Sequence, residues 1–224
     1  NNTTGDIVAL GVESAFNNTT AINNTAIGRQ ALYSNSTGSN NTALGYHALR
    51  ANTGANNTAA GFEALKSNTT GSKNTAVGVQ ALKSLTTAQD NTAVGWNALL
   101  NNLTGNRNNA FGKNSLLSIN GALGNQGFGN ETFRSTATGT YNVGIGDYAG
   151  FYNVTGSGNI GIGYRTTFAN TAGNHNVAIG YSALNTATTG SFNVGLGYNT
   201  DSGGFSESVI LGRDASATAS NQFV

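Results

Sequence analysis

The chain has 224 residues, of which only 8% are charged, and its formal net charge at neutral pH is +1. It contains 32 glycines but no cysteine, proline or methionine. These numbers exclude a disulfide framework and a thiolate zinc site and a collagen helix. They argue against a nucleic-acid surface, which needs a basic stripe, and no apolar run reaches the roughly 18 residues of a membrane span.

A glycine recurs at every seventeenth position along almost the whole chain, and this internal repeat is the strongest signal in the sequence. The step shortens to sixteen between Gly45 and Gly61 and to fifteen before Gly212. Eleven successive repeats also begin their motif with an asparagine, as in Asn24-Thr25-Ala26-Ile27-Gly28. The asparagines are Asn24, Asn41, Asn57, Asn74, Asn91, Asn108, Asn125, Asn142, Asn159, Asn176 and Asn193.

Each repeat is expected to form one coil of a parallel β-solenoid, with a short strand at the motif before each glycine. The repeat is about half the length of a two-helix repeat, and Gly, Asn and Thr are poor helix formers. An Ala-Leu segment follows most strands, and a turn comes next, often at Thr-Gly, where we expect glycine to supply a positive φ. The sequence therefore predicts an all-β protein of about 12–13 coils.

The coils change in character along the chain. We expect Thr-Ala coils over 1–107, irregular coils over 108–141, and Val-Gly coils with a degenerate last coil over 142–224. The irregular stretch carries phenylalanine where other coils have smaller aliphatic residues. Because the period continues through all three stretches, we predict a single continuous domain over 1–224.

Strand alternation places Thr25 and Ile27 on one face of the strand and Ala26 on the other. A large aliphatic residue recurs at the Ile27 position, so we expect that face to form the core. The face with only alanine or glycine would then pack closely against a partner chain. Each coil buries only about two large aliphatic side chains, and the free energy gained is small compared with the conformational entropy lost when a whole repeat is ordered. We therefore expect an obligate homo-oligomer.

The motif also resembles a known family. Asn23-Asn24-Thr25-Ala26-Ile27-Gly28 and the copies at 142–146 and 176–180 are similar to the head repeats of trimeric autotransporter adhesins. The form at 41–49 resembles repeats of phage tail fibres and bacterial surface proteins, and the stretch 209–224 resembles the last coils of such heads. The resemblance implies a left-handed β-roll, a homotrimer, and an extracellular or virion fibre that mediates adhesion. The coils of those heads are commonly shorter than the coils of this chain.

The residue after the motif glycine is often aromatic, and it is elsewhere charged, so it should lie at an exposed edge. One hypothesis is a stripe of rings that stack on sugars of a cell-surface glycan. The alternative is stacking between coils at a subunit boundary. The candidate residues are Tyr46, Phe62, Trp96, Tyr164, Tyr181 and Tyr198.

The asparagines allow two interpretations. Several stand in Asn-x-Thr sequons and could carry glycans, but a ladder in which side-chain amides bond along the solenoid is favoured. The sequons considered begin at Asn23, Asn40, Asn56, Asn68, Asn102, Asn130 and Asn153.

The sequence contains no clear pattern of catalytic or metal-binding residues. Glu131 and Asp147 fall near one column on adjacent coils, and paired carboxylates suit glycoside hydrolysis. They stand alone, however, and His47 and His175 are too far apart in the repeat to share a metal. We predict that the chain is not an enzyme and has no cofactor, no nucleic-acid partner and no membrane insertion.

The predicted function is that of a structural fibre segment that attaches to a cell surface, with glycans or a receptor as the ligand. A purely architectural filament is the alternative. A column of threonines could instead bind ice, although by the alternation above it should be partly buried. That column is Thr25, Thr42, Thr58, Thr75 and Thr92.

Overall fold

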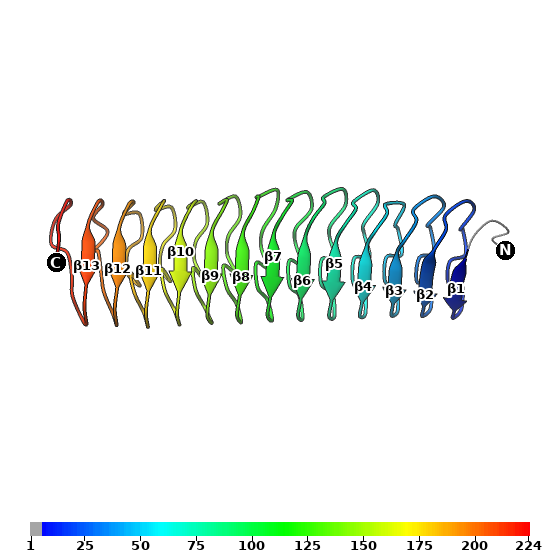
Figure 1. The fold of residues 1–224 in the computed structure, drawn as a ribbon, viewed down its shortest axis with the longest axis horizontal. Helices are drawn as coiled ribbons and strands as arrows, with labels where there is room; N and C mark the ends of the chain where they lie inside the picture. The colour runs from blue at the N-terminus through cyan, green and yellow to red at the C-terminus, as the bar shows by residue number, and fades with distance from the viewer. Residues whose placement is uncertain (1–5) are drawn as a thin grey trace. The chain divides into compact units, whose positions relative to one another are not determined.

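A computed structural model describes residues 6–224, and over this range the chain is a parallel β-solenoid of about 12 turns. Each turn contributes one short strand, followed by a run of tight turns that leads to the next strand (Figure 1). No helix occurs among these residues. The predicted all-β solenoid is therefore confirmed, and residues about seventeen positions apart are neighbours on successive coils.

Thirteen strands fall at the predicted motifs. They are β1 (Ile7–Leu10), β2 (Asn24–Ile27), β3 (Thr42–Leu44), β4 (Thr58–Ala60), β5 (Thr75–Val77), β6 (Thr92–Val94), β7 (Asn109–Phe111), β8 (Gln126–Phe128), β9 (Val143–Ile145), β10 (Ile160–Ile162), β11 (Val177–Ile179), β12 (Val194–Leu196) and β13 (Val209–Leu211).

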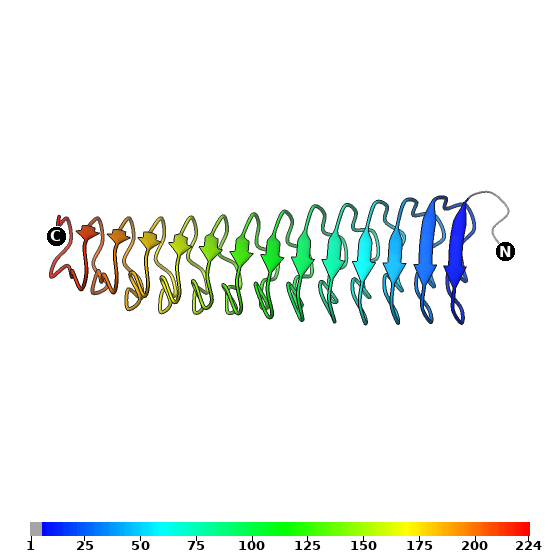
Figure 2. The same ribbon diagram turned by 60° about the horizontal axis from the view of Figure 1, so that its bottom comes forward.

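The chain divides into two compact units, one ending at Asn109 and the other running from Ala110 to Val224. In the first unit, β1 to β6 pair in parallel in sequence order, and equivalent residues of successive coils are partners, such as Ala26 and Ala43. In the second unit, β8 to β13 pair in the same way (Figure 2). We describe each unit by itself, and the prediction of a single continuous domain stays a prediction.

The assignment of the strand faces was wrong. Ala26 and the equivalent alanines of β3 to β6 are completely buried inside their own chain, whereas Ile27 is 37% exposed and Ile145 is 42% exposed. The aliphatic column thus lies on the outer face of the sheet, together with the half-buried Thr25 column. The inner face packs on the Ala-Leu segment, whose leucines, such as Leu49, are fully buried.

The narrow interior of the coil explains this reversal. A carbon added at Gly195 would lie 2.7 Å from the side chain of Leu184, and one added at Gly144 would lie 2.7 Å from the ring of Phe133. The inner side of the strand therefore has room only for a methyl group or a hydrogen. In the last coil, where alanines at 215 and 217 line the interior, the inner strand residue is the larger Ile210.

The motif glycines are required by the close approach of consecutive coils. Gly61 has a φ of 143°, and a Cβ there would lie 2.3 Å from the carbonyl oxygen of Gly78 in the next coil. The Thr-Gly turns differ from expectation. Gly38 and Gly54 do not adopt a positive φ, and glycine is needed there because a Cβ would meet a backbone oxygen of the following coil at 2.1 and 2.0 Å.

The positive φ values fall elsewhere in the coil. Asn23, Gln30 and Leu32 have φ values of 58°, 56° and 51°, and the equivalent positions repeat this in most coils. Asn23 directly precedes β2, whereas Gln30 and Leu32 follow it. These left-handed residues make tight turns on both sides of the strand, and a single leucine side chain is directed into the coil.

The asparagine ladder is confirmed. The backbone N–H of Asn159 donates to Oδ1 of Asn142 at 2.9 Å, and Nδ2 of Asn142 donates to the carbonyl oxygen of Gly156 at 2.9 Å. The same two bonds recur at most coils of both units. Because these side chains are buried, the ladder satisfies backbone groups that would otherwise lack partners.

Candidate functional site

The predicted aromatic residues stack between coils. In the first unit, the rings of Tyr46 and Phe62 are 5.3 Å apart and nearly parallel. In the second unit, Tyr181 lies between Tyr164 and Tyr198, with centroids 5.1 and 5.2 Å away. Stacking between coils is thus shown, whereas a subunit boundary at these rings and a contact with sugars both stay predictions.

This stacking limits what the aromatic columns can do. All six residues, Trp96 included, are between 38% and 50% exposed. Tyr181, however, has both ring faces covered by its neighbours, so it presents mainly its edge and its hydroxyl group. Since a sugar stacks on a ring face, the middle of this column is poorly suited to the predicted contact.

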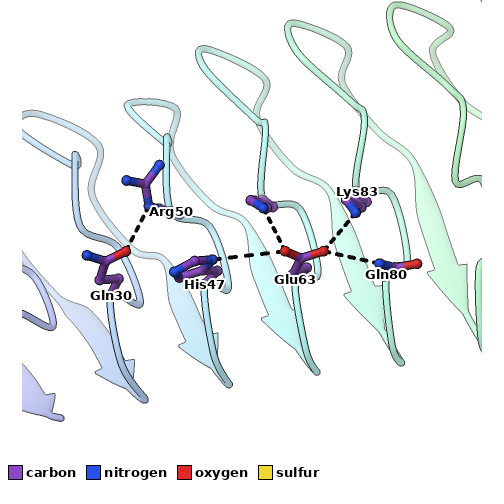
Figure 3. A network of polar contacts seen from close by, with 7 residues as sticks. Gln30, His47, Arg50, Glu63, Gln80 and Lys83 are labelled. Atoms are coloured by element: carbon purple, nitrogen blue, oxygen red, sulfur yellow. Dashed lines mark hydrogen bonds and ion pairs between the residues drawn. The ribbon is translucent and has the colours of Figure 1, made fainter. Parts of the chain in front are cut away.

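A cluster of charged and polar side chains crosses several coils of the first unit (Figure 3). Glu63 is its centre, with only 8% of the residue exposed. Its carboxylate accepts from Lys66 at 2.6 Å, from Lys83 at 2.7 Å and from Gln80 at 3.1 Å. His47 Nδ1 lies 4.0 Å from the same carboxylate. The cluster thus connects three successive coils through one acid.

The electrostatics follow from these contacts. The hydrogen bonds from Lys66 and Lys83 lower the pKa of Glu63 from its ordinary 4.5 to about 2, against the opposing effect of burial. Burial lowers the pKa of His47 from its ordinary 6.5, and the charges of Lys66 and Arg50 lower it further. At neutral pH Glu63 is therefore ionised and His47 is neutral, and this arrangement is typical of a structural ion-pair network. Our sequence analysis missed this cluster, because its residues lie one coil apart and form no local motif.

The two carboxylates considered for catalysis have separate partners. Glu131 Oε2 lies 3.7 Å from Nη1 of Arg134, and Oδ1 of Asp147 accepts a hydrogen bond from the backbone N–H of Asn130 at 2.8 Å. Over residues 6–224, no three His, Asp or Glu side chains gather in a group that could hold a metal ion. The prediction that the chain is not an enzyme stays a prediction.

The sequons divide into two groups. Asn68, Asn102 and Asn153 are buried and bond to the turn of their own coil, as Asn68 does to Gly71 at 2.9 Å. A glycan cannot be attached there in the folded chain. Asn23, Asn40 and Asn56 are exposed, and Asn130 is half-buried.

The outer strand face differs from expectation because it carries the large aliphatic residues. In the second unit it presents the exposed residues Phe128, Ile145, Ile162, Ile179, Leu196 and Leu211 on adjacent strands. In the first unit the threonine column lies on this same outer face, with Thr58 exposed and the other four threonines half-buried. The aliphatic column, predicted as core, is thus a surface.

Sequence analysis also missed an aromatic pocket in the second unit. The pocket has a volume of about 210 Å³ and lies across two consecutive coils. A signal for it was present, because the buried leucine of the Ala-Leu segment is replaced in these coils by Gly150 and Thr167. The pocket is lined by Tyr148, Phe151, Tyr152, Tyr164, Arg165 and Phe168.

Neither a scan of protein-family models nor a search of curated protein sequences finds a match to this chain. In the described range, no helix has the length and apolarity needed to cross a bilayer.

Proposed function

We propose that the chain is a structural segment of an extracellular or virion fibre, assembled as a homotrimer of left-handed β-rolls, that attaches to a cell surface. The observation that carries this proposal is the aliphatic column on the outer face of the second unit. It leaves a continuous apolar strip uncovered in a single chain, and such strips mark interfaces.

The geometry of the strip favours a second copy as its cover. Ile145, Ile162 and Ile179 are partners on consecutive parallel strands, which lie about 4.8 Å apart, so they form a regularly spaced row. Half-buried Val143 and Val177 flank it on the same face. A row with this spacing is matched in register by the same row of another copy, and closed homo-oligomers are the common result. The adhesin resemblance supplies the number three.

The interface is therefore proposed on the face opposite to the one that sequence analysis favoured. Alanine and glycine cannot face a partner, because they are buried within their own coil. In this proposal, burial of the aliphatic strip between copies stabilises a chain whose coils have only a small apolar interior.

Light scattering on the purified chain tests this assembly. We expect the mass of a trimer for the unaltered chain and of a monomer for the double variant Ile162→Lys, Ile179→Lys. A matched control, Thr171→Lys, places a charge on an exposed turn residue and should keep the trimer. A monomeric unaltered chain that unfolds cooperatively would overturn the proposal.

Attachment through surface glycans is the second part of the proposal. A trimer of repeats offers many equal contacts, and weak contacts become effective when several engage together. Binding of the fluorescent chain to whole cells, before and after periodate oxidation of their glycans, tests it. Binding that survives oxidation would point to a receptor of another kind, and no binding to any cell would favour a purely architectural filament.

Ice binding gains support from one observation, the outward position of the threonine column. Thr42, Thr58 and Thr75 are partners on adjacent parallel strands, so they recur at the regular spacing of the strands. A regularly spaced row of threonines could match a repeating lattice of water. Thermal hysteresis of the purified chain, compared with the variant Thr58→Lys, Thr75→Lys, tests this second candidate, and an unaltered chain without hysteresis excludes it.

A further inference from the structure

The aromatic pocket of the second unit coincides with a break in the buried leucine column. Gly150 occupies the position of a leucine, and a carbon added there would lie 2.0 Å from the ring of Phe133 in the preceding coil. Phe133 is fully buried and occupies the space of the missing leucine. The packing inside the coil therefore changes at this point. Functional sites are expected where a regular pattern is interrupted.

Some ring pairs of the pocket are nearly parallel and others nearly perpendicular, so the rings do not form one stacked column. Phe151 stacks on Phe168 with centroids 5.3 Å apart, and Tyr152 meets both rings edge-on, at 4.7 and 5.1 Å. Tyr148 stands at 84° to Tyr164, with centroids 5.9 Å apart. This arrangement, unlike the column at Tyr181, surrounds a space with rings from several directions.

Arg165 supplies the charge of the pocket. Its guanidinium lies 4.1 Å from the centroid of Phe168, a cation–π contact that fixes the plane of the group. Among residues 6–224, no carboxylate lies within ion-pair distance of Arg165, and its buried Nε has no hydrogen-bond acceptor. The guanidinium therefore keeps its capacity for an anionic ligand.

Three tyrosine hydroxyls complete the chemistry. Within the described part of the chain, Tyr148, Tyr152 and Tyr164 make no hydrogen bond through their hydroxyl groups. A phenol hydroxyl can both donate and accept. The pocket thus combines apolar ring surfaces, several neutral hydrogen-bonding groups and one unpaired cation.

We propose that this pocket binds the ring of an acidic sugar, with Arg165 paired to its carboxylate. A planar guanidinium matches a carboxylate with two parallel hydrogen bonds. The exposed aromatic surface of Tyr152, which meets Phe151 and Phe168 edge-on, accepts the C–H face of the ring, and the hydroxyl groups pair with those of the sugar. The pocket volume suits one small ring rather than a long chain. The inference rests on the proposed attachment to glycans and names the site and the class of sugar.

Saturation-transfer NMR and calorimetry with three small probes test the proposal on the intact chain. The probes are glucuronate, neutral glucose and benzoate. We expect glucuronate to bind at least about tenfold more tightly than glucose, because the charge-assisted pair is lost with the neutral sugar. It should also bind more tightly than benzoate, which lacks the hydroxyl groups.

Variants locate the site. Arg165→Gln should weaken glucuronate binding by about tenfold or more, and Arg165→Lys should weaken it less, because the charge remains without the planar fork. The matched control is Arg213→Gln, which removes an exposed arginine that also lies over a tyrosine ring, Tyr198. This control should leave binding unchanged within about twofold.

Three results would overturn the proposal: equal binding of glucose and glucuronate, benzoate binding as tightly as glucuronate, or full binding by Arg165→Gln. If circular dichroism shows that Arg165→Gln does not fold, the comparison uses Arg165→Lys and Tyr152→Ala. Failure here, with the trimer and periodate-sensitive attachment retained, would leave the proposed function standing. Conversely, glucuronate binding by a chain that attaches to no cell would overturn only the proposed function.

Discussion

The two units share one backbone plan but differ in what fills the coil and what covers the strands. In the first unit the inner column is uniform from β2 to β6, with alanine on the strand and leucines such as Leu49, Leu65 and Leu82 opposite. In the second unit the strand residue is glycine in four coils, and Phe133 replaces one leucine. The outer face carries threonine beside aliphatic residues in β2 to β6 of the first unit, except for the small Ala60, and valine or isoleucine beside aliphatic residues in β9 to β13 of the second.

Comparison of the two units shows that residues inside the coil and residues on its outer face are subject to different constraints. Inside, a larger residue on one wall is matched by a smaller one on the other, as in the contact between Phe133 and Gly144. Outside, no such compensation is needed, so the change from Thr75 to Val177 at equivalent strand positions alters the surface without altering the fold. The residue types on the outer face can therefore vary without a change of fold.

The largest effect is expected at the motif glycines, which both units require equally. Gly61→Ala and Gly163→Ala would each place a carbon 2.3 Å from a backbone oxygen of the next coil at a φ unfavourable for alanine. We expect each to lower the free energy of unfolding by about 3 kcal/mol or more, measured by urea denaturation. Gly204→Ala, at a φ of 85° with nothing within 4 Å, should cost only about 1 kcal/mol. Equal losses at all three positions would refute the close approach of coils as the cause.

The size compensation of the second unit can be tested by a double-mutant cycle. Phe133→Leu should cost about 1–2 kcal/mol through a cavity, and Gly144→Ala about 1–3 kcal/mol through overpacking. Because each change relieves the other, the double variant should be more stable than the sum predicts by about 1 kcal/mol. Phe133→Leu combined with Gly195→Ala, in a different coil, serves as control and should be additive.

The asparagine ladder should matter similarly in the two units. Asn142→Ala removes the acceptor for Asn159 N–H and the donor to Gly156, and we expect a loss of about 1–3 kcal/mol in the free energy of unfolding. Asn74→Ala in the first unit should give a similar loss. Asn120→Ala, at an exposed position, should change stability by less than about 0.5 kcal/mol. A neutral Asn142→Ala would show that the ladder contributes little.

The charged cluster should give the first unit its own dependence on pH. The pKa of Glu63 is lower in the folded chain, so its stabilisation is complete above its ordinary 4.5 and is lost as pH falls towards about 2. The lowered pKa of His47 acts in the same direction, and its contribution declines as pH falls below 6.5.

Urea denaturation followed by the fluorescence of Trp96, the single tryptophan, measures this dependence in the first unit. Glu63→Gln should lower the free energy of unfolding at pH 7 by about 1–2 kcal/mol and flatten its decline between pH 5 and 2. The exposed Asp90→Asn should leave the profile unchanged. A steep acid decline that persists in Glu63→Gln would place its source elsewhere.

The repeat, the strand positions, the recurrence of glycine after each strand and the asparagine ladder could all be predicted from the amino-acid sequence. These features recur at a fixed period, and each depends on contacts between equivalent residues of neighbouring coils. Exposure of the aromatic positions such as Tyr46 and Tyr198 could also be predicted, because the same column tolerates charge.

The strand face that points inwards could not be predicted from the sequence and became clear from the folded coils. Alternation separates Ala26 from Ile27 but does not say which of them points inwards, and the preference of large aliphatic residues for a core suggested the wrong answer. Each short coil turns so tightly that its interior holds one leucine layer against a methyl group. The larger side chains are therefore left outside. The Glu63 cluster and the Arg165 pocket depend on residues a coil apart, and the same stacking of coils brings them together.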